Sequence, residues 1–203
     1  MTYYDDIYDF AIDEHYLITT AEARSLGIPT VELAKLAHRG RLEHLGNGVY
    51  RLARHVASPA DPYAIAVKRA GQGAFLYGES VLALLDLAPT NPLHIYVATA
   101  ARVRRSLPAG IVVVKVRSGA PVTTYEGIRC QIAAEAIRTC RGMMMPERLR
   151  MAAEEALAQG YLSQREFDSI MEEIACWRRD RTAEGTSTWQ SSASPAAKLQ
   201  VSS

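Results

Sequence analysis

The stretch that most constrains the fold is residues 17–52, LITTAEARSLGIPTVELAKLAHRGRLEHLGNGVYRL. It begins with a helix start signal, because the Thr19 hydroxyl can accept a hydrogen bond from a free amide of the first turn. Glu22 stands three residues later, which is the spacing of a capping box. We therefore predict a short helix over residues 20–26.

A second helix follows after a turn. Gly27 stands where a helix often ends in the left-handed conformation, and Pro29 suits a helix start. We expect Thr30 to cap this second helix and Gly40 to end it. Two short helices joined by a Gly-containing turn predict a helix-turn-helix.

The second helix has two different faces. Leu33, Leu36 and Ala37 follow the spacing of one apolar stripe, which we expect to pack on the rest of the domain. The opposite face carries small, cationic and hydrogen-bonding side chains: Val31, Lys35 and His38, with Ala34 and Arg39 beside them. Such a face suits the major groove of DNA, where lysine can donate to guanine and small apolar groups can contact a thymine methyl.

A hairpin over residues 42–52 completes the pattern. Asn47 lies between Gly46 and Gly48, and these residue types accept the positive φ angles of a tight turn. The hairpin predicts a wing, with Arg41 and Arg51 placed to contact backbone phosphates.

Local charge favours DNA binding over the alternative, a scaffold that only packs on the following domain. Residues 24–54 carry six Lys and Arg residues but only Glu32 and Glu43 as acids, although the whole chain has a formal net charge of only +1. An excess of positive charge fits a surface that faces phosphate. The candidate DNA-binding residues are therefore Thr19, Thr30, Val31, Lys35, His38, Arg39, Arg41, Asn47 and Arg51.

The other predicted elements give an α+β protein: an N-terminal winged helix-turn-helix followed by a small mixed sheet packed with helices. We expect a first helix over residues 2–14, strands over 93–98 and 111–116 with a helix-like piece over 99–106 between them, and a hairpin over 122–132. Asp61 is expected to cap a helix that ends near residue 70, and further helices follow over 81–85, 133–139 and 146–159. Ser163 opens the last helix, with Glu166 in capping-box position.

The predicted domains are residues 1–56, a linker at 57–60, a second domain at 61–180 and a disordered tail at 181–203, rich in Ser, Thr and Ala.

The remaining composition argues for a cytoplasmic protein. Cys130, Cys140 and Cys176 are widely spaced, which favours buried free thiols in a reducing compartment over zinc or disulfides. No apolar run approaches the roughly 20 residues of a membrane span, so we expect no membrane. The acidic start MTYYDDIYDF does not have the order of a secretion signal.

The motifs also favour a protein that is not an enzyme. No Asp-x-Asp pair, phosphate loop, nucleophile elbow or paired metal-ligand spacing occurs in the chain, and its five His residues are scattered singly. We expect no catalytic residue, no metal and no cofactor.

A second group of basic residues lies in the predicted second domain. Arg102, Arg104, Arg105, Lys115 and Arg117 fall between Asp86 and Glu126, and no acidic residue lies in that interval. They form either a solvated surface or a second binding patch, which would meet an acidic protein partner or continue along DNA. We hypothesise the protein partner, because charge complementarity speeds the search for one partner.

The N-terminal part resembles the AbiEi antitoxins of bacterial type IV toxin-antitoxin systems. The resemblance lies in the Thr-capped helix, SLGI, a second helix ending in RG, and L-x-x-L-x-N-G-V-Y-R-L, and it is most specific over residues 18–52. It implies a repressor of its own operon that binds double-stranded operator repeats, with residues 30–39 on the recognition helix and Asn47 on the wing. It also implies a C-terminal domain that counteracts a nucleotidyltransferase-like toxin. The leading rival interpretation is a stand-alone transcriptional regulator whose second domain binds a ligand or dimerises, and a weaker one is an enzyme with a degenerate site.

Overall fold

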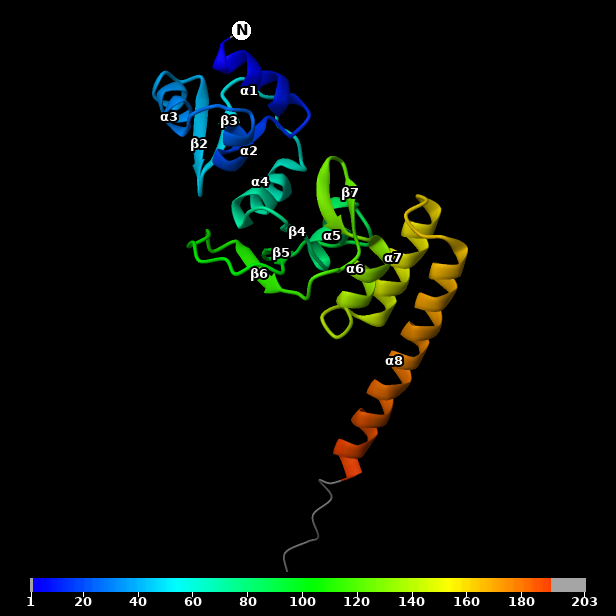
Figure 1. Cartoon of the computed structure of the whole chain (residues 1–203). Helices are drawn as coiled ribbons and strands as arrows, with labels where there is room; N and C mark the ends of the chain where they lie inside the picture. The colour runs from blue at the N-terminus through cyan, green and yellow to red at the C-terminus, as the bar shows by residue number, and fades with distance from the viewer. Residues whose placement is uncertain (1, 191–203) are drawn as a thin grey trace, which may run out of the picture.

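The computed structural model describes residues 2–190, and it describes side chains as far as Trp177. The chain begins with α1 (Tyr3–Ile12), β1 (Leu17–Thr19), α2 (Thr20–Ser25), α3 (Thr30–His38), β2 (Leu42–Gly46) and β3 (Val49–Leu52). The three strands form one antiparallel sheet in the order β1-β3-β2 (Figure 1). This arrangement confirms the predicted helix-turn-helix with a hairpin wing. The prediction missed β1, which pairs with β3 in the middle of the sheet.

The first helix is shorter than predicted. Thr2 and Asp5 form a reciprocal capping box at its start, and Asp13 follows its end. His15 and Tyr16 then take φ angles of 56° and 59°, so the chain turns sharply instead of continuing the helix to residue 14.

The caps of α2 and α3 differ. Thr19 and Glu22 form the predicted capping box of α2. The prediction that Thr30 caps α3 is wrong, because Pro29 holds the cap position and no side chain caps this helix. Proline offers no side-chain acceptor, so the first turn closes through the backbone alone, where the carbonyl of Pro29 accepts the amide of Glu32 at 2.9 Å.

The second sheet is mixed, as predicted, and has the order β6-β5-β4-β8-β7. Its strands are β4 (Phe75–Leu76), β5 (Ile95–Thr99), β6 (Ile111–Lys115), β7 (Val122–Tyr125) and β8 (Ile128–Gln131). The pairs β5·β6 and β4·β8 are parallel, whereas β4·β5 and β7·β8 are antiparallel. The prediction missed β4, a two-residue strand at the centre of this sheet.

The connection from β5 to β6 contradicts the predicted helix-like piece over residues 99–106. Described residues 100–110 contain no helix. The amide of Ala101 donates to Oγ1 of Thr99 at 3.1 Å, which turns the chain away at the end of β5. We call this connection the arginine loop, residues 100–110.

Helices cover the second sheet. Helix α4 (Asp61–Ala70) contacts β3 of the first sheet and β4, β5 and β8 of the second, so it joins the two parts (Figure 1). Asp61 does not cap α4 as expected. Ala60 holds the cap position and provides no side-chain hydrogen bond, and the fixed φ of Pro62 stabilises the first turn. The other helices are α5 (Glu79–Leu84), α6 (Ala133–Thr139), α7 (Pro146–Ala158) and α8 (Gln164–Gln190).

Helix α8 continues past the predicted start of the tail at residue 181 and reaches Gln190. Its predicted capping box is confirmed, since Ser163 and Glu166 exchange hydrogen bonds of 2.9 and 3.3 Å. The rest of the predicted tail, residues 191–203, lies outside the described residues.

Two of the three thiols are buried, as predicted. Burial raises the pKa of Cys130 and of Cys140 to about 12. Cys176 contradicts the prediction and is exposed, because it lies on an outward position of α8.

The two parts of the molecule share packed surfaces. Leu17 and Val49 of the winged helix belong to the same buried cluster as Leu76, Leu82 and many residues of the second part. Lys68 of α4 forms salt bridges of 2.7 Å with Glu14 and 2.5 Å with Glu22. These contacts hold the winged helix against α4, and the proposed boundary at residues 57–60 stays a prediction.

Candidate nucleic-acid interface

Helix α3 buries one face and exposes the other. Leu33 is fully buried against the winged-helix core, with Leu36 and Ala37 partly buried beside it, as predicted. On the other side Val31 is 57% exposed and the Lys35 side chain 52% exposed, and His38 and Arg39 are at least partly open to solvent. A large apolar side chain left this open on a helix next to cations is available for contact with a partner.

Lys35 is the best-placed cation of this face. Its ammonium lies 2.7 Å from the Glu32 carboxylate, one turn earlier in the same helix. An exposed pair of this kind contributes about 0–1 kcal/mol, so Lys35 can exchange Glu32 for a stronger acceptor at little cost. Glu32 thus holds the Lys35 side chain on this face, and Lys35 can still leave this ion pair to bind another partner.

The two predicted threonines have local partners. Oγ1 of Thr19 accepts the amide of Glu22 at 3.2 Å, so this hydroxyl orients α2. Oγ1 of Thr30 accepts from Nε of Arg24 at 3.3 Å, which ties the start of α3 to α2. Arg24 is exposed and was not among the predicted site residues, although it is basic and lies in the helix-turn-helix sequence.

The flanking arginines are also engaged within the protein. The guanidinium of Arg41 lies 4.2 Å from the centre of the Tyr4 ring, a cation–π contact that fixes its direction. Arg51 forms a salt bridge of 2.6 Å with Glu43 on the neighbouring strand, and its side chain is only 20% exposed. Arg51 is therefore a less open phosphate ligand than the sequence suggested.

The tip of the wing contacts the arginine loop. Asn47 takes the predicted left-handed conformation, with φ of 53°. Its Nδ2 donates to the carbonyl of Ser106 at 2.9 Å, and Nη1 of Arg105 donates to the carbonyl of Asn47 at 3.3 Å. Arg69 of α4 donates to the carbonyl of Leu45. The contacts of Asn47 join residues about 60 positions apart, so the local sequence pattern gave no sign of them.

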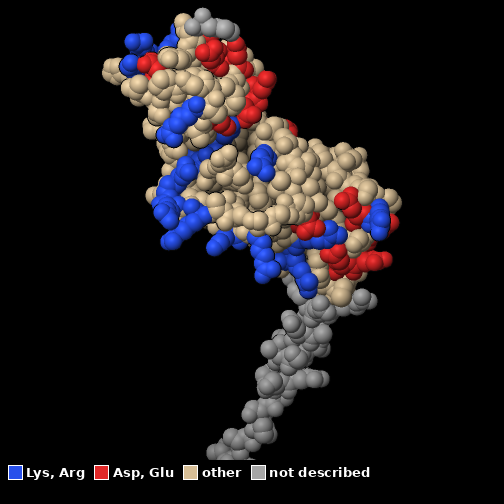
Figure 2. All heavy atoms as spheres, in the orientation of Figure 1, with Lys and Arg blue, Asp and Glu red and all other residues tan. Residues whose placement is uncertain are grey.

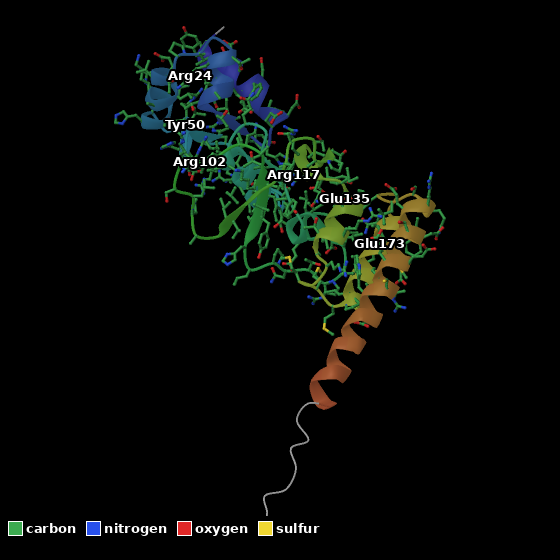
Figure 3. The ribbon with its side chains drawn as sticks, turned by 60° about the horizontal axis from the view of Figure 1, so that its bottom comes forward. Arg24, Tyr50, Arg102, Arg117, Glu135 and Glu173 are labelled. Atoms are coloured by element: carbon green, nitrogen blue, oxygen red, sulfur yellow. The ribbon has the colours of Figure 1, made fainter. Side chains whose placement is uncertain are left out.

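The five residues of the second basic group lie in two separate places. Arg102, Arg104 and Arg105 are exposed on the arginine loop and line a hollow of about 430 Å³ with Gly71 and Gln72. Lys115 ends β6 and Arg117 follows it. Figure 3 shows Arg24, Tyr50 and Arg102 following one another along one side of the molecule, whereas Arg117 lies further toward Glu135.

Charges of opposite sign gather on different sides. In Figure 2, Lys and Arg side chains form a run on the left flank, below the winged helix. Asp and Glu gather on the right of the winged helix, where α1 carries Asp5, Asp6 and Asp9. The molecule therefore presents a basic side that extends from the helix-turn-helix over the second part.

The described part of the chain offers neither a metal site nor a membrane span. No group of three or more His, Cys, Asp or Glu side chains within residues 2–177 is arranged to hold a metal ion. Among the described helices, none combines the length and apolar character needed to cross a membrane.

The fold and this face define a winged helix-turn-helix. In agreement, residues 5–53 match the family described as "Transcriptional regulator, AbiEi antitoxin", as the sequence resemblance predicted. The match covers the winged helix and ends before α4. No curated protein matches the chain.

One solved structure that matches the chain is the Rv2827c protein from Mycobacterium tuberculosis. The sequences are 15% identical, the TM-score is 0.36, and the match covers 85% of this chain and 82% of the other.

Proposed function

We propose that this protein is a non-enzymatic transcriptional repressor that binds double-stranded operator DNA through the exposed face of α3. The observation that carries the proposal is that the protein's own second part leaves this face uncovered, with Val31 and Lys35 open to solvent. The family match over residues 5–53 supports the same role, because that family is described as one of transcriptional regulators.

The residues have different roles in this proposal. Val31, Lys35 and His38 face base edges, since they share the outward face of a helix that fits the major groove. Thr30 and Arg39 flank that face, and Arg41, Asn47 and Arg51 belong to the phosphate-facing side. Thr19 acts indirectly, by capping α2.

We further propose that the protein is an antitoxin that acts in the cytoplasm. The family description supports it, because it names AbiEi antitoxins. In this proposal the winged helix represses the operon, and residues 61–180 counteract a nucleotidyltransferase-like toxin encoded beside it. The alternative is a regulator whose second part binds a ligand or dimerises.

A gel shift with the DNA upstream of the protein's own reading frame tests repression. We expect a specific complex that a scrambled duplex of the same composition does not compete away. Equal binding to both duplexes would contradict the operator proposal.

Co-expression tests the antitoxin role separately. The full chain and the adjacent reading frame are expressed alone and together, and growth is measured. Growth arrest by the neighbour that this protein relieves supports the antitoxin, whereas a harmless neighbour supports the stand-alone regulator.

A further inference from the structure

A hollow on the second part of the molecule has the dimensions of a site for a small ligand. The end of α4 forms one wall, with Ala70, Gly71 and Gln72, and residues 101–105 of the arginine loop form the other. The hollow between them has a volume of about 430 Å³, and none of the described residues of α3 lines it. Sites for small molecules are concave and measure about 300–1,000 Å³, so the hollow falls within their range.

The hollow carries an excess of positive charge. Arg102, Arg104 and Arg105 line it, and all three are exposed. Among the described residues none of the three forms a salt bridge, whereas Arg51 and Arg138 each pair with a carboxylate. Guanidinium groups stay charged at physiological pH, so three of them without counter-charges repel one another. An anion that bridges them would relieve this repulsion, which favours an anionic ligand.

Arg105 is held in place at the wall of the hollow. Its Nη1 donates to the carbonyl of Asn47, at the tip of the wing, at 3.3 Å. Its Nη2 lies beside Gly71, where an added Cβ would stand 3.0 Å from this nitrogen. Gly71 has a φ of 110°, which glycine adopts readily, so the backbone can approach the guanidinium closely. Arg105 is therefore oriented before a ligand binds, which lowers the entropic cost of binding.

The number and type of these cations indicate which anion fits. Arginine can bind phosphate oxygens through two parallel N–H groups, a geometry that lysine does not offer. A phosphate monoester carries a charge of about −1.5 to −2 at pH 7, so a single phosphate balances only part of three positive charges. Two or more phosphates joined together supply enough negative charge within a small volume. The hollow is therefore better suited to such a ligand than to a single phosphate.

We propose that the hollow between α4 and the arginine loop binds a small molecule with two or more adjacent phosphate groups, held by Arg102, Arg104 and Arg105. Nucleoside polyphosphates and inorganic polyphosphates share this chemistry. The proposal goes beyond the proposed function, because the site needs neither α3 nor operator DNA. It assigns these arginines to a small ligand in place of the protein partner hypothesised from sequence. Arg117 lies away from the loop, toward Glu135, and is not part of the site (Figure 3).

Isothermal titration calorimetry of the full chain tests the site, with inorganic tripolyphosphate as the probe. We expect the wild type to bind one tripolyphosphate per chain. R102Q/R104Q removes two arginines of the hollow, whereas R148Q/R165Q removes two exposed arginines of α7 and α8 and is the control of equal charge. Affinity should fall on the order of tenfold in R102Q/R104Q and stay unchanged in the control, because only the first variant loses charge-assisted hydrogen bonds to phosphate. All four arginines are exposed, so both variants should keep the thermal midpoint of the wild type.

Further titrations of the wild type identify the source of the phosphate groups. Inorganic phosphate should bind about tenfold more weakly than tripolyphosphate, because it forms fewer charge-assisted hydrogen bonds with the three arginines. ATP and GTP carry three phosphates and a nucleoside. Tighter binding of either nucleotide than of tripolyphosphate would identify the ligand as a nucleoside polyphosphate, whereas equal or weaker binding would identify it as an inorganic polyphosphate.

Three results would overturn the proposal. The first is that the wild type does not bind tripolyphosphate at millimolar concentration, or binds inorganic phosphate as tightly. The second is that R102Q/R104Q binds tripolyphosphate as tightly as the wild type. The third is an equal loss in both double variants, which would mean that tripolyphosphate responds only to net charge. None of these titrations contains DNA, so their failure leaves the proposed function unaffected, and failure of the gel shift leaves this site unaffected.

Discussion

Helix α3 and the wing differ in how much of their surface is free. On α3 the outward side chains are open, and the ion pair of Lys35 with Glu32 lies within the helix. On the wing, Arg51 pairs with Glu43 and Asn47 holds the arginine loop. In the proposed function the difference separates two roles: α3, whose outward face is open, reads bases, whereas the polar groups of the wing are already engaged within the protein.

The largest expected effect comes from mutating the buried and the exposed faces of α3 separately. Leu33 is fully buried, so Leu33→Ala should lower the free energy of unfolding by about 2–5 kcal/mol. Val31→Ala should change it by less than about 0.5 kcal/mol, because the valine is exposed. Urea denaturation of the two variants measures this difference. Similar losses in both would mean that Val31 packs inside the protein and cannot face DNA.

Lys35→Ala tests the open face directly. We expect binding to the upstream duplex to weaken by about 1–3 kcal/mol, because a base-contacting cation is removed. Arg148→Ala, which removes a cation from α7, is the matched control and should leave affinity unchanged. Gel shifts measure the affinities of both variants. If the Lys35→Ala variant binds the duplex as tightly as wild type, Lys35 is not part of the site.

Asn47→Gly removes the side-chain hydrogen bond between the wing and residues 100–110 but keeps the turn. Glycine accepts the positive φ of this position, so the hairpin should survive while the hydrogen bond to Ser106 disappears. A net contribution of about 0.5–1.5 kcal/mol is expected for such a bond. Hydrogen exchange should therefore become faster in residues 100–110 but not in α3. Unchanged exchange in the loop would show that the wing does not hold it.

Arg51→Gln should have the smallest effect. Its pair with Glu43 is partly exposed, so stability should change by about 0–1 kcal/mol, read from the thermal midpoint. DNA affinity should fall less than in the Lys35→Ala variant. A larger loss of affinity than in that variant would make the wing the main DNA contact.

Several features that depend on neighbouring residues could be predicted from the sequence, although the caps expected at Thr30 and Asp61 could not. The Thr19–Glu22 box, the Asn47 turn and the apolar stripe of α3 each follow from side chains a few positions apart, and each is present. Strand β4 was missed because two residues give no periodic pattern, and its pairing comes from β5 and β8, which are distant in sequence.

The site was harder to predict than the fold. The arginines of the loop were recognised as a group, but their place beside the wing depends on hydrogen bonds between Asn47 and residues 105 and 106. The partners of Arg41 and Arg51 were missed for the same reason, since Tyr4 and Glu43 meet them only through folding. The sequence shows that these segments are basic, whereas tertiary contacts determine where the arginine side chains lie.

The central claim of the proposed function is that the exposed face of α3 binds DNA. The most direct measurement is a map of backbone amide chemical shifts by NMR, recorded on the full chain with and without the upstream duplex. We predict that the largest changes fall on residues 30–41 and on the wing, with little change along α7. Changes confined to α7 and α8, with α3 unaffected, would contradict it.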